Sequence, residues 1–282
     1  MTISLQQALA GAGFWNLWNA ADVGVIALVL AASYLVVTGP LRDRLGWGRA
    51  PTKSKRTYFL LGCLALYVGL GSPLDWLSDN YLMSAHMLEH MLLIFACAPL
   101  FLAGTPDWLA RAILGRGFFR WLWTKCVNPA AALGIFISIL SVWHLPYLYN
   151  LTLTHEAVHF TEHAMFMVIG LIVWWPLLSP LPELPRLQDS AKLVYLFVEE
   201  VLMTVPFAII TFAPAPFYTF YVHQPRLWGL SPLDDQIIGG IIMRLASALS
   251  MGVEFAKSFF RWFAGYRGID PVPDPAPHTP LL

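Results

Sequence analysis

Apolar residues in this chain are gathered into long runs, and charged residues, prolines and glycines stand between them. Crossing the roughly 30 Å of hydrocarbon in a bilayer takes about 20 predominantly apolar residues in a helix. Seven runs approach or reach that length, near 21–38, 57–70, 82–103, 130–143, 159–178, 191–213 and 235–256. The pattern therefore predicts an all-α, polytopic membrane protein with seven transmembrane helices.

The composition agrees with this prediction. Hydrophobic residues make up 57% of the 282 residues and charged residues only 12%, whereas an ordinary soluble domain has about 25% charged residues. No connection between the runs is long enough to hold a separate soluble domain. We expect a single membrane domain over 1–268, followed by a proline-rich cytoplasmic tail over 269–282.

The basic residues set the expected orientation, because lysine and arginine are enriched in cytoplasmic loops. If the chain has seven spans, fifteen of its seventeen lysines and arginines fall on the side of the C-terminus. Only Arg226 falls on the opposite side, and Arg244 lies within a span. The N-terminus is therefore predicted outside and the C-terminus in the cytoplasm. Arg244 lies within the seventh run at a depth similar to Glu200 in the sixth, which predicts a structural ion pair. No basic stripe with interleaved aromatic residues is present, so no nucleic-acid partner is expected.

Histidines are concentrated at the outer side, where seven of the eight fall. Two helices that run inward carry the same pattern, H-x-x-E-H, at His86–His90 and at His159–His163. Residues four apart share one face of a helix and lie about 6 Å apart. If the two helices face each other, they present four imidazoles and two carboxylates at one depth, which indicates a metal site. The competing interpretation is that each histidine only hydrogen-bonds to a neighbouring helix.

The predicted metal cradle is accompanied by carboxylates that orient the imidazoles and by a thioether on the same helix. Imidazole together with thioether on the oxidising side of a membrane favours copper as Cu(I). His155 is expected beside the cradle and nearer its mouth. The cradle consists of His86, His90, His159 and His163, the orienting carboxylates are Glu89 and Glu162, and the thioether is Met87.

Other metal chemistries fit parts of the same pattern. The string from His155 to His159 matches H-E-x-x-H, and each H-x-x-E-H matches the inverted zinc-protease signature, in which the glutamate activates a zinc-bound water. These matches share the same few residues, so they are not independent. A di-iron site would need Glu-x-x-His pairs from further helices, and haem would need two axial imidazoles. We expect a carrier and not an enzyme, with the metalloprotease and the haem protein as alternatives.

Three longer stretches carry a resemblance to a known family. They are SAHMLEHMLLIFACAPLFLAGTP (84–106), WHLPYLYNLTLTHEAVHFTEHAMFMVIGLIVWWPLL (143–178), and TFAPAPFYTFY followed by SPLDDQIIGGIIM (211–243). Here the chain resembles the CtaG-type cytochrome c oxidase assembly factors, a seven-helix membrane family linked to copper delivery to haem–copper oxidases. The resemblance covers the third to the seventh predicted span. The chain departs from it at Arg244, where an apolar or aromatic residue is expected, and in the C-terminal tail.

The resemblance implies a multi-pass protein of the bacterial plasma membrane, in which histidines on the periplasmic side handle copper for the oxidase. It adds His144 and Asp235 to the expected metal ligands, and Gln236 beside them at the rim. The partners it implies are the subunits of cytochrome c oxidase, a copper donor on the outer side, and the lipid bilayer.

A different class of function needs no metal. The chain would then be a membrane scaffold that holds oxidase subunits during assembly, with an aromatic outer loop as its docking surface. A scaffold is expected to tolerate His→Gln changes that keep hydrogen bonding, whereas a copper site is not. The aromatic residues of this loop are Phe217, Tyr218, Phe220, Tyr221 and Trp228.

Overall fold

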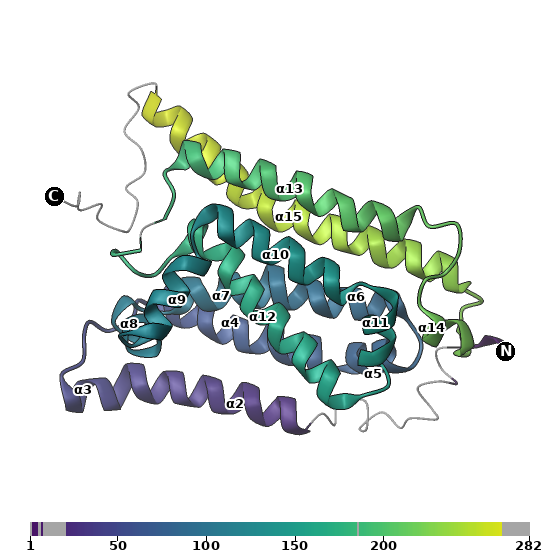
Figure 1. Ribbon diagram of the computed structural model, residues 1–282. Helices are drawn as coiled ribbons and strands as arrows, with labels where there is room; N and C mark the ends of the chain where they lie inside the picture. The colour runs from purple at the N-terminus through teal and green to yellow at the C-terminus, as the bar shows by residue number, and fades with distance from the viewer. Residues whose placement is uncertain (1, 5–6, 8–20, 185, 267–282) are drawn as a thin grey trace.

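The structure of this chain, a computed structural model, describes residues 2–4, 7, 21–184 and 186–266 (Figure 1). The predicted tail over 269–282 lies outside the described residues, as does most of the segment before the first span. The described part is predominantly helical, which confirms the all-α prediction. Apart from helices it contains two strands of two residues each, β1 (Thr2–Ile3) and β2 (Arg226–Leu227), which pair in parallel.

The helices follow one another with short connections. They are α2 (Ala21–Val36), η2 (Val37–Leu41), α3 (Arg42–Leu45), α4 (Lys53–Leu70), α5 (Pro73–Asn80), α6 (Met83–Leu92), η3 (Leu93–Cys97), α7 (Ala98–Gly104), α8 (Asp107–Leu114), α9 (Phe118–Cys126), α10 (Pro129–Trp143), α11 (Pro146–Thr152), α12 (Glu156–Leu178), α13 (Asp189–Thr211), α14 (Thr219–His223) and α15 (Pro232–Tyr266), where η marks a π-helical turn.

Within the described residues, six continuous helical segments are long and apolar enough to cross a membrane. They run over Asp22–Leu45, Lys53–Asn80, Met83–Gly104, Glu156–Leu178, Asp189–Thr211 and Pro232–Tyr266. The predicted span near 130–143 is α10, whose 15 residues rise only about 22 Å at 1.5 Å per residue. It reaches the required length only together with α9, and the two are bent by 84°. By length and composition, the described part of the chain therefore holds six candidate spanning segments, or seven if the bent pair counts as one.

Polar residues and glycines explain several helix ends. Thr52 and Asn128 cap α4 and α10 by accepting a hydrogen bond from a backbone N–H in the first turn, as N-cap residues commonly do. The apolar run over 108–119 predicts one interfacial helix, but the structure divides it between α8 and α9. Gly115 and Gly117 lie at the break with φ of +59° and +77°, a conformation that glycine adopts without steric cost.

The third span, formed by α6, η3 and α7, lies at the centre of the molecule. In its most apolar stretch 61% of residues are buried, compared with 17% in the first span. α6 packs on α15, and η3 and α7 pack on α4 and α12. α2 lies along one side of the molecule, and α13 and α15 lie together along the opposite side (Figure 1). The two helices that carry H-x-x-E-H thus belong to the packed interior.

Ion pairs connect α13 to α15. Arg244 pairs with Glu200, the two residues that the sequence places at a similar depth. Nearer the C-terminal end of α15, the Nζ of Lys192 lies 3.3 Å from Glu254. Because charged side chains inside a membrane protein are costly unless paired, these contacts hold the last two spans together.

Candidate metal centre

The two H-x-x-E-H motifs meet at the end of the molecule where α6 and α12 begin. His86 and His90 stand one turn apart on α6 and are fully buried, and their ring centroids are 4.3 Å apart. His159 and His163 stand one turn apart on α12, with ring centroids 4.2 Å apart. Each pair therefore presents two imidazoles from one helix face, as the spacing predicts.

The imidazoles of the two helices also face each other. The ring of His86 lies 5.2 Å from that of His159 and 5.8 Å from that of His163, centroid to centroid. The ring of His90 lies 5.4 Å from that of His163. The structure thus brings all four histidines of the predicted cradle into one cluster.

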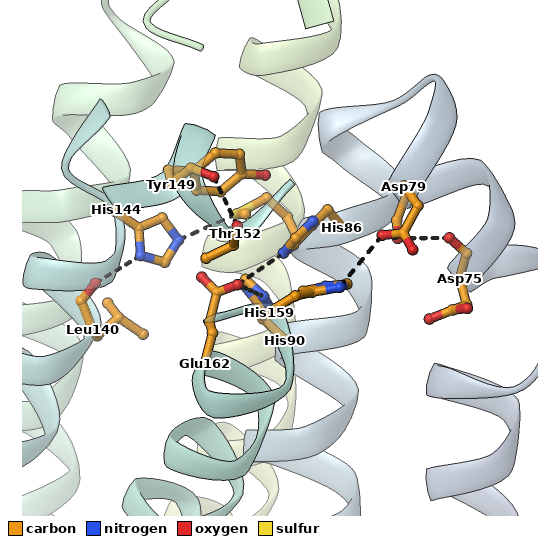
Figure 2. Close-up of polar contacts among 12 residues, drawn as sticks. Asp75, Asp79, His86, His90, Leu140, His144, Tyr149, Thr152, His159 and Glu162 are labelled. Atoms are coloured by element: carbon orange, nitrogen blue, oxygen red, sulfur yellow. Dashed lines mark hydrogen bonds and ion pairs between the residues drawn. The ribbon is translucent and has the colours of Figure 1, made fainter. Parts of the chain in front are cut away.

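Two fully buried glutamates, Glu89 and Glu162, belong to this cluster. Figure 2 shows Glu162 beside His86 and His90. The Oε2 of Glu162 lies 3.4 Å from the Nε2 of His86 and 3.7 Å from the Nε2 of His90. Among the described residues, neither carboxylate oxygen of Glu89 has a hydrogen-bond partner. Ser78 lies close to Glu89, but its hydroxyl donates to the carbonyl of Asp75 at 2.9 Å.

The donor atoms fall into two overlapping groups with the spacing that a metal ion requires. The inner group is His86, His90, Glu162 and His163, and the outer group is His86, Glu89, His159 and His163. Within each group, one ligand atom from every residue lies within 4.8 Å of the others. Glu89 and Glu162, which the sequence analysis expects only to orient the imidazoles, therefore stand at ligand distance themselves.

Many of these donor atoms lack a partner. Both ring nitrogens of His90 and the Nε2 atoms of His86, His159 and His163 are buried without a hydrogen bond in the part of the chain that the structure describes. Buried polar atoms in folded proteins are almost always hydrogen-bonded. Several imidazoles and carboxylates therefore have free lone pairs in one place. A bound cation would accept these lone pairs and supply the missing partner.

His144 and Met87 form a second contact beside the cluster. The Nδ1 of His144 donates to the carbonyl of Leu140 at 2.7 Å, and its Nε2 lies 3.3 Å from the sulfur of Met87. Since Nδ1 carries the proton, Nε2 keeps a free lone pair. The ring of His144 lies 6.0 Å from that of His90, so an imidazole and a thioether adjoin the cradle. His144, which the resemblance implies as a ligand, lies outside both metal-ligand groups.

Three buried tyrosines, none of them predicted as part of the metal site, pack over the cluster at the end where α6 and α12 begin. The hydroxyl of Tyr218 donates to the carbonyl of His144 at 3.0 Å, and that of Tyr221 donates to the carbonyl of Ser78 at 2.8 Å. Tyr149 lies against Tyr218, with ring centroids 3.9 Å apart. Burial raises the pKa of Tyr218 and Tyr221, so both keep the protons that they donate. We call Tyr149, Tyr218 and Tyr221 the tyrosine cover.

The cover changes the interpretation of the aromatic loop. Tyr218 and Tyr221 are both 2% exposed, and only Trp228 among the loop's large aromatic residues is well exposed. A docking surface made of all five aromatic residues is therefore wrong, because Tyr218 and Tyr221 are buried against the cluster and Phe217 and Phe220 are only partly exposed. The run FYTFY holds these residues together in the sequence, but nothing in it indicates which way they face.

Access to the cluster is lateral. A carrier site is expected to open directly to the outside, but the structure does not show this, because His86 and His90 are fully buried. His159 and His163 instead border a cavity of about 730 Å³ between the first two spans and α12. Its outer end is lined by Asp75, Asp79 and Glu156, and an oxygen of Asp79 lies 3.8 Å from the Nδ1 of His159.

Asp235 and Gln236 lie outside both metal-ligand groups. The two carboxylate oxygens of Asp235 accept hydrogen bonds from the backbone N–H of Met83 and Ser84, at 2.7 and 3.2 Å. Gln236 accepts from the N–H of Phe217 and donates to the carbonyl of Ile210. The structure thus gives this pair a structural role in place of the expected ligand and rim roles. Asp235 fixes the start of α6, and Gln236 fixes the loop that leads to the tyrosine cover.

The two remaining outer histidines are exposed and take no part in the cluster. The ring of His155 contacts the hydroxyl of Thr154 at 2.9 Å, and His223 lies at the end of α14. The string H-E-x-x-H therefore does not bring its two histidines together at one site, whereas both H-x-x-E-H motifs do. His155 therefore does not orient the imidazoles of the cradle.

A sequence profile identifies the family. The profile of the cytochrome c oxidase caa3 assembly factors matches residues 32–265. The chain belongs to this family. Uncharacterized proteins of Mycobacterium bovis and Mycobacterium tuberculosis are each 25% identical over 239 residues, which cover 77% of this chain and 35% of theirs. One from Mycobacterium leprae is 25% identical over 271 residues, 88% of this chain and 40% of its own.

The chain thus spans 35 to 40% of the length of these curated relatives. No solved structure shows a significant match. The matched stretch of the family profile contains every residue of the two metal-ligand groups, the tyrosine cover and the Asp235–Gln236 pair.

Proposed function

We propose that this chain binds copper in the α6–α12 cluster and delivers it to cytochrome c oxidase during assembly of the enzyme. The observation that carries the proposal is the meeting of two H-x-x-E-H motifs. Their imidazoles and carboxylates stand at ligand spacing, and several of their buried donor atoms have no hydrogen bond within the described residues. Membership of an oxidase assembly family supplies the context. The copper is cargo in this proposal, and the chain acts as a carrier and not as an enzyme.

Copper is favoured over other metals by the donor set. Imidazoles suit several transition metals, whereas a thioether selects for soft ions such as Cu(I). Met87 contacts His144, and the ring of His144 adjoins that of His90. A calcium or magnesium site would need mainly oxygen ligands, and the cluster holds more imidazoles than carboxylates.

The structure supports a route for loading and release. The carboxylates of Asp79 and Glu156 at the outer end of the cavity attract cations, and His159 stands next to Asp79. The fully buried His86 and His90 lie beyond it. A cation would therefore meet His159 and His163 first, and a donor or an oxidase subunit would exchange ligands from this lateral side.

The distribution of basic residues supports a site on the periplasmic side of the bacterial plasma membrane. Its proposed partners there are the oxidase subunits that receive copper and a donor that loads the site. The periplasmic side is an oxidising environment. Thioether and imidazole groups are suitable Cu(I) ligands there, in place of cysteine thiolates.

The experiment is elemental analysis of the detergent-purified protein, as isolated and after loading with Cu(I) under reductant. We expect the native chain to retain copper and the variant with His86, His90, His159 and His163 all changed to alanine to lose it. A variant with His155 and His223 changed to alanine is the matched control and should retain copper. Monodisperse elution of each variant in detergent establishes that it is folded.

Other outcomes identify other functions. Retained zinc or iron in place of copper would favour the metalloprotease, di-iron or haem alternatives. A native chain that holds no metal, with oxidase maturation unchanged by His→Gln substitutions in the cluster, would contradict the proposal in favour of a metal-free scaffold.

A further inference from the structure

The six clustered side chains contain more donors than one ion needs. A single tetrahedral ion takes four ligands, and three suffice for a site that keeps a position open for exchange. The inner and outer groups together offer four histidines and two glutamates, and they share only His86 and His163. His90 and Glu162 belong to the inner group alone, and Glu89 and His159 belong to the outer group alone.

We propose that the cluster is a dinuclear centre that holds two copper ions side by side. This inference rests on the proposed function and adds its stoichiometry. The inner ion is held by His90 and Glu162, and the outer ion by Glu89 and His159. The shared residues His86 and His163 complete the two sites, so that each ion has three protein ligands and one position open.

Charge supports two ions. Glu89 and Glu162 are each fully buried, and in the described part of the chain the ion pairs of Glu162 are with histidines while Glu89 has none. An isolated carboxylate buried away from water carries a large desolvation penalty. Glu162 belongs only to the inner group and Glu89 only to the outer group, so two ions would give each carboxylate a cation within its own group.

The two positions differ in access. His159 is partly exposed and borders the cavity, whereas His90 is fully buried beneath Phe166, with ring centroids 4.3 Å apart. The outer position therefore fills and empties first, and the inner position exchanges through it. Such a centre releases copper in two steps, one ion at a time.

The test is the stoichiometry of Cu(I) bound by the full chain in detergent, measured against a chromophoric Cu(I) chelator. The native chain should bind two ions. Glu89→Gln with His159→Ala should bind one, and His90→Ala with Glu162→Gln should also bind one. His223→Ala is the control and should bind two. X-ray absorption of the loaded native chain should show copper–copper scattering at roughly 3.5–4 Å, the spacing of two-metal sites, and neither double variant should show it.

One ion bound by the native chain, without copper–copper scattering, would overturn the dinuclear centre and leave the proposed function standing. No ion bound would overturn both. Two ions bound by the native chain and by both double variants would place the copper elsewhere and also overturn the inference. The glutamine substitutions keep side-chain volume, and the native stoichiometry is decisive even if a variant fails to fold.

Discussion

Asp235 shows how a single acidic residue at an apparent metal site can serve the backbone. Its carboxylate accepts two hydrogen bonds from the first turn of α6, where unpaired N–H groups of the helix need acceptors. Asp235, which belongs to α15, therefore acts as an N-terminal cap of α6. By fixing the start of α6, it fixes the positions of His86 and His90. Asp235 and Gln236 therefore contribute to the site by positioning α6 and the aromatic loop.

Changing Asp235 to alanine should destabilise the protein without removing a copper ligand. Two buried N–H groups would lose their acceptor, at a cost of about 1–3 kcal/mol each by the usual penalty for unsatisfied buried donors. We expect a lower midpoint of thermal unfolding in detergent and unchanged copper stoichiometry below that temperature. Asp234→Ala, an exposed neighbour, is the control. A variant of normal stability that binds less copper would instead make Asp235 a ligand.

Tyr221 is expected to control the rate of exchange. Its hydroxyl bonds to the carbonyl of Ser78 and lies 3.4 Å from the Nδ1 of His86. Tyr221→Phe removes the bond, worth about 1 kcal/mol, and loosens the tyrosine cover. We expect Cu(I) to transfer to an external chelator several-fold faster, with the bound amount unchanged. Tyr147→Phe, at a side chain that is 81% exposed, should transfer at the native rate.

At the level of elements, close packing of α12 on the third span sets the distance between the two motifs. A Cβ added at Gly170 would lie 2.9 Å from the Cβ of Ala98 and 3.1 Å from the Cα of Ile94. The glycine therefore lets the two helices approach. Helix interfaces in membranes commonly use small residues in this way.

Gly170→Ala should push α12 away from η3 and α7 and spread the histidines of α12 from those of α6. We expect weaker Cu(I) binding together with lower thermal stability. Gly134→Ala in α10 is the matched control, because a Cβ there meets nothing within 4 Å and alanine favours a helix by about 1 kcal/mol over glycine. Equal copper affinity in the two variants would show that helix spacing does not govern the site.

The sequence predicts six of the spans and the gathering of the four histidines, because both depend on local periodicity. The i, i+4 spacing of His86 with His90 and of His159 with His163 fixes a helix face, and the apolar runs fix the depth. The sequence does not reveal the function of Asp235, the inward packing of Tyr221 or the lateral access beside His159. These depend on contacts between residues far apart in the chain, such as Met83 with Asp235, and no local pattern encodes them.

For the whole molecule, an ionic cluster at the end opposite the histidines links the short helices to a loop. Arg111 and Arg120 both contact Glu183, at 2.8 and 3.0 Å. Hydrogen bonds from Arg111 lower the pKa of Glu183 to about 2. Because the unfolded-state pKa of a glutamate is about 4.3, this group stabilises the fold above that pH, and its contribution is lost as the pH falls toward 2.

The Glu183 pair is partly exposed, so its contribution should be small, about 0.2–1 kcal/mol. We expect Glu183→Gln to lower the midpoint of thermal unfolding at pH 7. At pH 3 the midpoints of the variant and the native chain should differ less. Glu156→Gln, at an exposed glutamate in the first turn of α12, should show no comparable change with pH. A difference that grows on acidification would contradict this assignment.

The predicted orientation can be tested by cysteine labelling. Cys63 and Cys97 are buried and Cys126 is partly exposed, at the end where basic loops are expected in the cytoplasm. A membrane-impermeant maleimide should therefore label Thr154→Cys in intact cells and should reach Cys126 only after the membrane is opened. Labelling of Cys126 in intact cells would reverse the orientation.

The ion pairs between α13 and α15 have a consequence for biosynthesis. Arg244 and Glu200 each lie within a segment that must enter the bilayer, and inserting one charged residue at the centre of a helix costs about 2.5–3.5 kcal/mol. Although both segments are apolar enough to span a bilayer, each carries a charge that has no ion-pair partner until the other segment arrives. The last two spans should therefore leave the translocon as a helical hairpin, already paired. Nascent chains that end before α15 should fail to hold α13 in the membrane.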